Sequence, residues 1–342
     1  MSRAVVLRGT ADVKVEEVQK GTPGPDDIVI RPRAVGICGS DIDMYRGVYT
    51  GLWRLPVIIG HEFSGEVVAL GSNVRGLGLG DRVTAEEIQW CGFCKACKAG
   101  FPNYCENMGE LGFTTPGALA DEIVVQQKYV HRLPPNVSFE AGSVIEPASV
   151  AYTGIFVQGG GLIPGDFVAV FGAGPIGLLS TMLAKVAGAE VCVFEPNEWR
   201  RKMAKEMGAD HVQDPTQVDA VKTVKDLTGG YGANMAVECS ANERVVPLVI
   251  ESLRFKGRGV LIGMLEKPSM INGVTFVRHG ISLVGSLGHS GHDTFPHVIN
   301  LVARGVIDPS KVITHRFSIW EPEKAFEFAV QRGNSMKITL TQ

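Results

Sequence analysis

The sequence predicts an α/β protein with two domains, one rich in short strands and loops and one doubly wound around a parallel sheet. Three observations predict this. The chain has 342 residues, about the length of two domains. Residues 1–150 contain short β-like runs between Gly and Pro, such as DIVIRPRAVGIC and FSGEVVALG. From about residue 151, strand-like and helix-like segments alternate, which is typical of a parallel sheet.

The order of these segments predicts that one domain is inserted into the other. The alternating segments are, in chain order, FVAVFG, PIGLLSTMLAKVAGA, EVCVFEP, EWRRKMAKEMGAD, NMAVECS, GRGVLIG and ISLVGS. After about residue 290 the pattern is mixed again, with helices expected near 294–304 and 321–332 and a short strand near 336–341. We therefore expect residues 151–290 to form the parallel-sheet domain, and residues 1–150 and 291–342 to form the other domain.

Composition excludes several classes of function. The net charge is −3 and the pI is about 6.3, and no basic stripe is present, which argues against nucleic-acid binding. The N-terminus lacks an apolar signal-peptide core and no run approaches 18 apolar residues, so we expect a cytoplasmic protein that does not insert into membranes. An odd count of seven cysteines and a reducing compartment argue against structural disulfides.

The stretch VAVFGAGPIGLL predicts a dinucleotide site. Gly172, Gly174 and Gly177 have the G-x-G-x-x-G spacing, between a predicted strand and a predicted helix that Pro175 and Ile176 begin. The first glycine makes a tight turn, the second lets the backbone approach a pyrophosphate, and the third lets helix and strand pack closely. The helix N-terminus then faces the anion.

The strand that follows this helix predicts which dinucleotide binds. Glu195 lies at the end of the strand predicted in EVCVFEP, directly before Pro196 and 18 residues after Gly177. An acidic side chain there accepts hydrogen bonds from the adenosine ribose and repels a 2′-phosphate, which favours NAD over NADP. Arg200 lies five residues further on, so the preference is not absolute.

The densest cluster of cysteines predicts a structural zinc site. Cys91, Cys94, Cys97 and Cys105 follow a C-x2-C-x2-C-x7-C pattern. Four thiolates close a tetrahedral zinc shell and leave no place for water or substrate. A nucleic-acid finger would need a recognition helix and more positive charge than Lys95 and Lys98 supply. A redox Cys-x-x-Cys normally opens a helix after a strand, whereas Gly and Pro flank this segment.

A sparser set of residues predicts a second metal site. Cys38 lies in AVGICGSD, His61 and Glu62 lie in IIGHEFSG, and Glu146 lies in SVIEPASVAY. Cys, His and carboxylate are all zinc ligands, and three protein ligands leave a place for water or substrate. From spacing alone, a buried Cys, a turn and a helix cap account for these residues equally well.

The motifs together resemble a known family. They are GICGSD, GHEFSGEV, GDRV, CGFCKACKAG...NYC, IEPASVAY, VFGAGPIGLL, ECSA and the C-terminal MKITL. In combination they resemble, over nearly the full length, the zinc-containing medium-chain dehydrogenase/reductases, and most closely the sorbitol and polyol dehydrogenase branch. The segment around Glu146 supports this branch, since liver-type alcohol dehydrogenases have a Cys ligand at the matching place. The resemblance implies a GroES-like, mostly-β catalytic domain beside a Rossmann domain.

The resemblance also implies which residues hold metal. Cys38 and His61 match the catalytic zinc ligands. Glu62 and Glu146 match carboxylates that lie on that zinc or one water away from it, and the resemblance leaves open which of the two binds directly. The four cysteines at 91, 94, 97 and 105 match the structural zinc site, so two zinc ions are expected per chain.

Four further residues are expected around the catalytic zinc. Asp41 matches a residue that orients the His ligand, and Lys337 matches a cation that pairs with the acidic groups. Ser40 matches the hydroxyl that takes the proton from the substrate. Family members with a long proton relay have His where this chain has Asp43, and a carboxylate ordinarily has a far lower pKa than His. Either the relay ends differently here, or Asp43 contacts substrate hydroxyls.

These observations predict a zinc- and NAD-dependent dehydrogenase that oxidises a secondary hydroxyl of a polyol, sugar or cyclitol to the ketone. L-Threonine 3-dehydrogenase and a butanediol-type vicinal diol dehydrogenase are the alternative enzymes. A non-catalytic protein that kept only the fold is disfavoured, because Cys38, His61 and the carboxylates are all present.

Two loops are expected to line the substrate pocket, at residues 44–53 and 285–295. Tyr45, Trp53, His289 and His292 are the candidate side chains for binding hydroxyls, although packing accounts for them equally well. The small-molecule substrate is the expected partner, together with further copies of the chain. Residues 280–286 predict an edge strand that pairs across a two-fold axis, which gives a homodimer or homotetramer.

Overall fold

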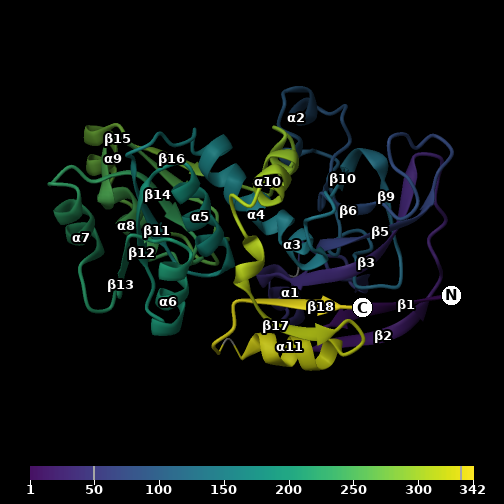
Figure 1. Cartoon of the computed structure of the whole chain (residues 1–342). Coiled ribbons are helices and arrows are strands. Elements are labelled where there is room, and N and C mark those ends of the chain that lie inside the picture. Colours follow the sequence, from purple (N-terminus) through teal and green to yellow (C-terminus); the bar gives the residue numbers. More distant parts are fainter. Residues whose placement is uncertain (49–50, 332) are drawn as a thin grey trace. The chain divides into compact units, whose positions relative to one another are not determined.

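The computed structural model describes residues 1–48, 51–331 and 333–342. The chain divides into two compact units. The first unit consists of Met1–Glu146 with His289–Gln342, and the second unit is Pro147–Gly288. Figure 1 shows the second unit in teal and green, whereas the first unit combines the purple and blue N-terminal part with the yellow C-terminal part.

The first unit is built mainly from antiparallel strands. Among its described residues, the strands are β1 (Ser2–Gly9), β2 (Asp12–Val18), β3 (Asp27–Ile37), β4 (Val57–Ile58), β5 (Glu62–Leu70), β6 (Arg82–Ala85), β7 (Ile88–Gln89), β8 (Gly109–Glu110), β9 (Ile123–Gln126), β10 (Val130–Arg132), β17 (Ile313–Ser318) and β18 (Lys337–Thr341). The main sheet has the order β10-β6-β5-β3-β18-β17, and β9 also pairs with β3. A smaller sheet has the order β2-β1-β4, and β7 pairs with β8.

The helices of the first unit are short. They are α1 (Gly39–Tyr45), α2 (Lys95–Lys98), η1 (Pro102–Tyr104), η2 (Gln127–Tyr129), α3 (Phe139–Ser143), α10 (Thr294–Ala303), η4 (Pro309–Val312) and α11 (Pro322–Val330). Phe63 on β5 and Phe326 on α11 are fully buried in the same apolar core, so the C-terminal helix completes the core of the N-terminal strands.

The register of β3 positions the chemistry of this unit. Gly36 pairs with Glu62 on β5, and Ile37 pairs with Ile338 on β18, which lies on the other edge of β3. A Cβ atom on Gly36 would collide with the Glu62 carboxylate, so glycine is required at this pairing. Cys38 follows Ile37 directly, so residues from three distant parts of the sequence meet at one end of the sheet.

The second unit is a parallel six-stranded sheet, as far as the described residues show, with the order β13-β12-β11-β14-β15-β16. Its strands are β11 (Phe167–Phe171), β12 (Glu190–Phe194), β13 (His211–Gln213), β14 (Ala233–Glu238), β15 (Leu253–Leu261) and β16 (Ser282–Gly285). All five residues of β11 are buried, as expected for a central strand covered on both faces. This sheet and the GroES-like unit confirm the predicted fold class.

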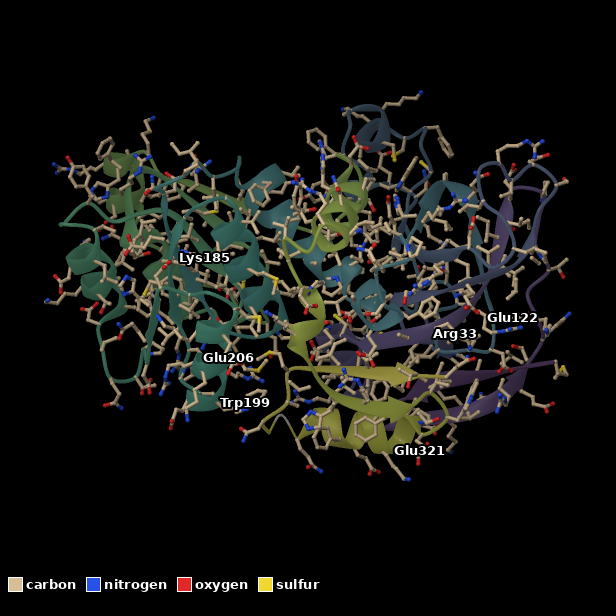
Figure 2. All side chains as sticks on the ribbon, in the orientation of Figure 1. Arg33, Glu122, Lys185, Trp199, Glu206 and Glu321 are labelled. Carbon is tan, nitrogen blue, oxygen red and sulfur yellow. The ribbon has the colours of Figure 1, made fainter. Side chains whose placement is uncertain are left out.

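Helices connect the strands of this sheet. They are α5 (Pro175–Val186), α6 (Glu198–Glu206), α7 (Ala220–Leu227), α8 (Val245–Ser252) and α9 (Gly273–His279), while α4 (Ile145–Tyr152) and the π-helix η3 (Thr153–Gln158) precede β11. Lys185 lies in the last turn of α5, where its Nζ donates to Ala189 and pairs with Asp210 at 2.7 Å (Figure 2). A cation is favourable at this end of a helix. No helix in the part of the chain that the structure describes could cross a bilayer.

Candidate metal and cofactor sites

The four clustered cysteines lie around the short helix α2. Their Sγ atoms are all within 4.8 Å of one another, and all seven cysteines of the chain, each of which the structure describes, are free thiols. Backbone N–H groups point at the sulfurs: the Cys94 N–H lies 3.3 Å from Cys91 Sγ and the Cys91 N–H lies 3.3 Å from Cys105 Sγ. The fold therefore brings these sulfurs together without a disulfide.

The electrostatics of this cluster fit a bound cation. Burial works against ionisation of Cys91, but N–H groups of Phe93 and Cys94 lower its pKa to about 6. Burial and the neighbouring thiols raise the pKa of Cys97 to about 12. Four adjacent thiols cannot all ionise unless a cation balances their charge. The donor set therefore fits a closed, structural zinc site.

Cys38, His61 and Glu62 form a second group. One ligand atom from each lies within 4.8 Å of the other two, and His61 and Glu62 are almost completely buried. Cys38 caps the N-terminus of α1, and Glu62 begins β5. The set of thiol, imidazole and carboxylate fits a zinc site with three protein ligands.

Asp41 holds two members of this group in place. Its Oδ2 accepts a hydrogen bond from the Cys38 N–H at 2.8 Å, and its Oδ1 lies 3.6 Å from His61 Nδ1. Burial opposes protonation of His61, but Asp41 and Cys38 raise its pKa well above the ordinary value. The negative groups that favour a charged imidazole equally favour a metal cation among them.

A buried ion pair neutralises Glu62. Lys337 Nζ lies 2.6 Å from Oε1 and 2.7 Å from Oε2 of Glu62, and it also donates to the Ile37 carbonyl at 3.2 Å. The two side chains are only 3% and 1% exposed. Burial lowers the pKa of Lys337, but Glu62 and Cys38 outweigh this effect and raise it, so the side chain stays charged. Lys337 therefore places a permanent cation beside the candidate ligands.

Glu146 belongs to a different group. Its Oε1 lies 3.1 Å from His289 Nε2, and Glu87 Oε2 lies 3.8 Å from the same nitrogen. All three side chains are buried. Burial raises the pKa of Glu87 to about 8, whereas His289 outweighs burial and lowers the pKa of Glu146. Glu146 and His289 were predicted as site residues from the sequence, but Glu87 was not. The only sign of Glu87 in the sequence is the pair of adjacent acidic residues in TAEEI.

The remaining residues expected at the zinc site lie on or near α1. Ser40 is partly buried two residues after Cys38, and Asp43 is partly buried in the same helix. Tyr45 packs on Phe326 with ring centroids 5.3 Å apart, which makes it a core residue. Tyr49 and Thr50, in the expected pocket loop 44–53, lie outside the described residues.

Trp53 is linked to His61 through one intervening ring. Its ring stacks on Phe113 at 5.7 Å, and Phe113 contacts the His61 ring at 4.7 Å. His292 is exposed and lies 6.4 Å from the Phe101 ring, in the neighbourhood of the cysteine loop. Of the two histidines expected in the pocket, the structure places only His289 among the buried acidic groups.

The glycine-rich turn of the second unit fits a dinucleotide. Gly172 has a φ of +99°, and a Cβ atom on Gly177 would collide with the Gly172 carbonyl. A Cβ atom on Gly174 would meet no atom within 4 Å, so open space lies beside the N-cap of α5. A pyrophosphate can approach the backbone at such a position. Pro175 and Ile176 form the first turn of the helix at this space.

Glu195 is held beside this turn. Its Oε2 accepts a hydrogen bond from the Ala173 N–H at 2.8 Å, and its Oε1 accepts one from the Asn197 N–H at 2.9 Å. Arg200 lies in the first turn of α6, where its N–H is capped by Asn197. Arg201, which the sequence did not single out, donates to the Glu195 carbonyl at 2.8 Å. An arginine therefore lies against the backbone of this acidic residue.

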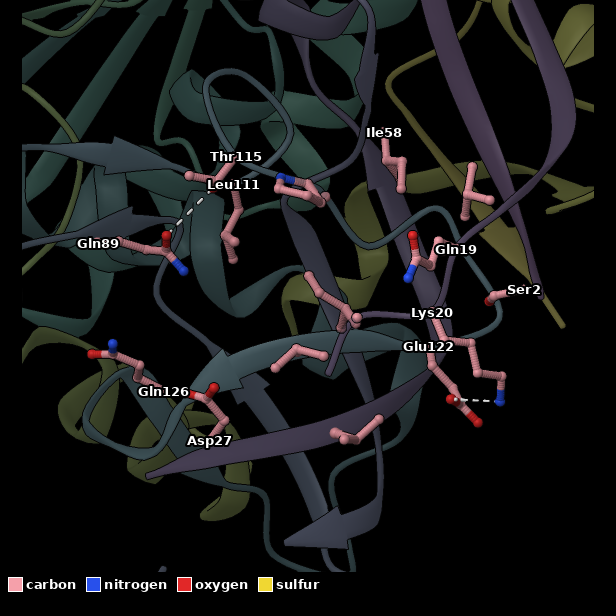
Figure 3. Close-up of a pocket in the computed structure, with 18 of the residues that line it drawn as sticks. Ser2, Gln19, Lys20, Asp27, Ile58, Gln89, Leu111, Thr115, Glu122 and Gln126 are labelled. Atoms are coloured by element: carbon pink, nitrogen blue, oxygen red, sulfur yellow. Dashed lines mark hydrogen bonds and ion pairs between the residues drawn. The ribbon is translucent and has the colours of Figure 1, made fainter. Parts of the chain in front are cut away.

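A surface pocket of about 390 Å³ lies elsewhere in the first unit. Figure 3 shows Lys20 and Glu122 paired at its rim, with Ile58 and Leu111 among the apolar lining. None of the predicted site residues, all of which the structure describes, lines this pocket. We assign it no role in the chemistry.

Two family descriptions match the chain. Residues 24–135 match the alcohol dehydrogenase GroES-like domain, and residues 175–304 match the zinc-binding dehydrogenase domain. Scyllo-inosose 3-dehydrogenase of Thermotoga maritima is 41% identical over 96% of this chain and 90% of its own length. Sorbitol dehydrogenase of Halalkalibacterium halodurans is 35% identical over 97% of this chain and 96% of its own length. L-Threonine 3-dehydrogenase of Caldanaerobacter subterraneus subsp. tengcongensis is 35% identical over 96% and 95%.

Solved structures of similar proteins have the same fold as this chain. An alcohol dehydrogenase from Escherichia coli CFT073 complexed with NADH superposes with a TM-score of 0.92 at 27% identity, covering 100% of this chain and 99% of its own. A protein from Sinorhizobium meliloti 1021 bound to NADP gives 0.92 at 28% identity, covering 100% and 99%. 2R,3R-Butanediol dehydrogenase from Bacillus subtilis gives 0.90 at 29% identity, covering 100% of both chains. The chain therefore belongs to the zinc-binding medium-chain alcohol dehydrogenase family and is a zinc-dependent dehydrogenase of alcohols and polyols.

Proposed function

We propose that the protein oxidises a secondary hydroxyl of a polyol, sugar or cyclitol to the ketone, reversibly, with NAD as the hydride acceptor. The observation that carries this proposal is the buried group of Cys38, His61 and Glu62 with its own cation, Lys337. Such a group suits a metal that must remain accessible to a substrate oxygen, because three protein ligands do not fill a zinc shell.

The chain's own residues have separate tasks in this reaction. Bound zinc supplies Lewis acidity that makes a substrate hydroxyl easier to deprotonate. Asp41 holds the Cys38 backbone and the His61 ring, so the ligands are already oriented before substrate arrives. Ser40, two residues after Cys38, is assigned to take the hydroxyl proton. Asp43, on the same helix, is assigned either to the later part of that proton path or to a substrate hydroxyl.

The cofactor assignment rests on the second unit. NAD supplies the acceptor for the hydride. The open space beside Gly174 supports a pyrophosphate there, and the carboxylate of Glu195 supports a ribose without a 2′-phosphate. Arg200 and Arg201 lie close to Glu195 in the sequence and reduce the expected preference for NAD over NADP. Among the similar solved structures, one is complexed with NADH and another is bound to NADP.

The substrate class rests on the relatives. Scyllo-inosose and sorbitol dehydrogenases support a polyhydroxylated substrate, and the 41% identity to the former favours a cyclitol. L-Threonine 3-dehydrogenase at 35% identity and butanediol dehydrogenase at 29% keep an amino acid or a vicinal diol as second candidates. The acidic groups around His289 favour the polyhydroxylated class, because carboxylates readily accept hydrogen bonds from hydroxyls.

We further propose a cytoplasmic enzyme that assembles into a homodimer or homotetramer. Seven free thiols support a reducing compartment. β16 is the terminal strand of the described sheet and offers its outer edge to a second copy. Analytical ultracentrifugation of the wild type against a variant with Pro at Leu283, on β16, would test this assembly.

A substrate panel tests the proposed function. The zinc-loaded protein is assayed for NADH formation with myo-inositol, sorbitol, L-threonine, 2,3-butanediol and ethanol, each also with NADP. We expect the highest kcat/KM for a cyclitol or an open-chain polyol with NAD. Preference for L-threonine would replace the proposed substrate, and absence of turnover with every alcohol and ketone would contradict the proposed function as a whole.

A further inference from the structure

Two buried carboxylates of the first unit, Glu62 and Glu146, are each paired with a different cation. Both oxygens of Glu62 lie on Lys337, while Glu62 stays grouped with Cys38 and His61. Glu146 is instead grouped with His289 and Glu87. The two carboxylates therefore differ in the cation that they pair with, which is Lys337 for Glu62 and His289 for Glu146.

His289 is built into this position. Its side chain is 0% exposed, and the Phe295 ring packs edge-on against it at 4.9 Å. The next residue, Ser290, donates to the Ile88 carbonyl on β7 at 3.5 Å, which fixes the segment beside Glu87. The ring is therefore held by apolar packing, and its segment is anchored to β7, the strand that directly follows Glu87.

The contacts of the ring are ionic. Nε2 lies between two carboxylates, 3.1 Å from Glu146 and 3.8 Å from Glu87, and neither ring nitrogen makes a directed hydrogen bond to a described residue. A buried carboxylate requires either a cation or a proton. Besides His289, the positive groups that act on Glu146 are His61 and Lys337, which belong to or pair with the Cys38–His61–Glu62 group. With His289 removed, Glu146 is therefore drawn toward that group.

We propose that His289 is a positioning residue that holds Glu146 outside the Cys38–His61–Glu62 group and so keeps one zinc coordination place for the substrate. This inference rests on the proposed function, because it requires zinc at that group. Without His289, Glu146 turns to the zinc as a fourth protein ligand. The site then resembles a closed structural site, which binds metal more tightly and reacts more slowly.

Zinc release measures this effect without relying on activity. The fully loaded protein is mixed with a chromogenic chelator, and the phase that is missing from Cys38→Ser is followed. In His289→Leu we expect that phase to slow by about tenfold and kcat to fall by about tenfold, with KM changing less. His289→Gln keeps a polar side chain of similar size and is expected to lower the zinc-release rate and kcat in the same way. This variant replaces His289→Leu in the experiment if the leucine variant does not fold.

A double variant and a matched control separate positioning from general damage. In His289→Leu with Glu146→Gln, the zinc-release rate is expected to return to that of the wild type, because no carboxylate remains to close the site. His131 is the matched control: it pairs with Glu86 at 3.0 Å and stacks on the same Phe295 ring at 5.0 Å, but Glu86 is outside both metal groups. His131→Leu should leave the Cys38-dependent phase unchanged.

Several outcomes would overturn the inference. Zinc release in His289→Leu at the wild-type rate or faster would show that His289 does not restrain Glu146. A third divalent ion per chain, lost in His289→Leu, would show that Glu87, Glu146 and His289 themselves bind metal. If the wild type lacks a Cys38-dependent zinc altogether, the proposed function fails instead, so the two failures are distinguishable.

Discussion

The cysteine cluster and the Cys38–His61–Glu62 group of the first unit differ in how their charge is balanced. The cysteine cluster has four sulfurs of one kind, held by backbone N–H groups within a span of 15 residues, from Cys91 to Cys105. The group at Cys38 has mixed ligands from distant segments and its own buried ion pair. Four protein ligands close a tetrahedral zinc shell, whereas three leave a place open. We therefore assign the proposed chemistry to the sparser group.

The largest effect expected from this comparison is on turnover. Cys38→Ser should lower kcat/KM on the order of 10⁴-fold, because the substrate loses the zinc that activates it. Metal analysis should find one zinc fewer per chain, and far-ultraviolet circular dichroism should match the wild type. Equal activity in the variant would show that the two groups had been assigned the wrong way round.

The second effect concerns the buried ion pair of the Cys38 group, which the cysteine cluster lacks. Lys337→Met removes the partner of a completely buried carboxylate, which should lower the free energy of unfolding by about 3 to 5 kcal/mol. Chemical denaturation measures this change. Lys337→Met with Glu62→Gln removes both charges and should recover most of it. Lys222→Met, which breaks the exposed pair with Asp226, is the control and should leave the denaturation midpoint unchanged.

The third effect concerns the cysteine cluster, which is expected to bind the structural zinc. Cys94→Ser should remove the other zinc and lower the free energy of unfolding by about 2 to 3 kcal/mol, since metal that binds only the folded state stabilises it. The folded fraction should keep most of its kcat. Loss of activity together with an intact zinc count and an unchanged melting temperature would contradict a supporting role for this cluster.

The smallest effect lies in the second unit, away from both metals. Glu195→Gln removes the negative charge expected to repel a 2′-phosphate, so the ratio of kcat/KM for NAD to that for NADP should fall by about tenfold. Steady-state kinetics with each cofactor measure this ratio. Glu198→Gln, in the exposed first turn of α6, should not change it. An unchanged ratio in Glu195→Gln would move the discrimination to Arg200 or Arg201.

The sequence predicted the parts of the fold that have local causes. β11, its glycine-rich turn and α5 follow one another within 20 residues, so hydrophobic pattern and turn chemistry suffice to recognise them. The roles of Cys38, His61 and Lys337 came from resemblance to a family, because spacing alone is equally compatible with a buried thiol or a turn. Their proximity depends on the register of β3 with β5 and β18, which no local pattern specifies.

Glu87 is the clearest example of a residue whose position could not be predicted from the sequence. It meets Glu146 and His289 only because Ser290 is bound to Ile88, across about 200 positions of sequence. The sequence offered two adjacent acidic residues in a strand-like segment, which are usually exposed. Their burial is a property of the assembled unit, so the ionic grouping around His289 could be found only in three dimensions.

The pairing of β3 with β18 has a consequence for biosynthesis. Glu62 and Lys337 are separated by 275 positions, so a growing polypeptide on the ribosome holds the acidic partner long before the basic one exists. During that interval the carboxylate must remain hydrated or protonated, and the N-terminal strands cannot reach their final burial. We therefore expect resistance of the first unit to proteolysis during translation to arise only after β18 has left the ribosome and docked along β3.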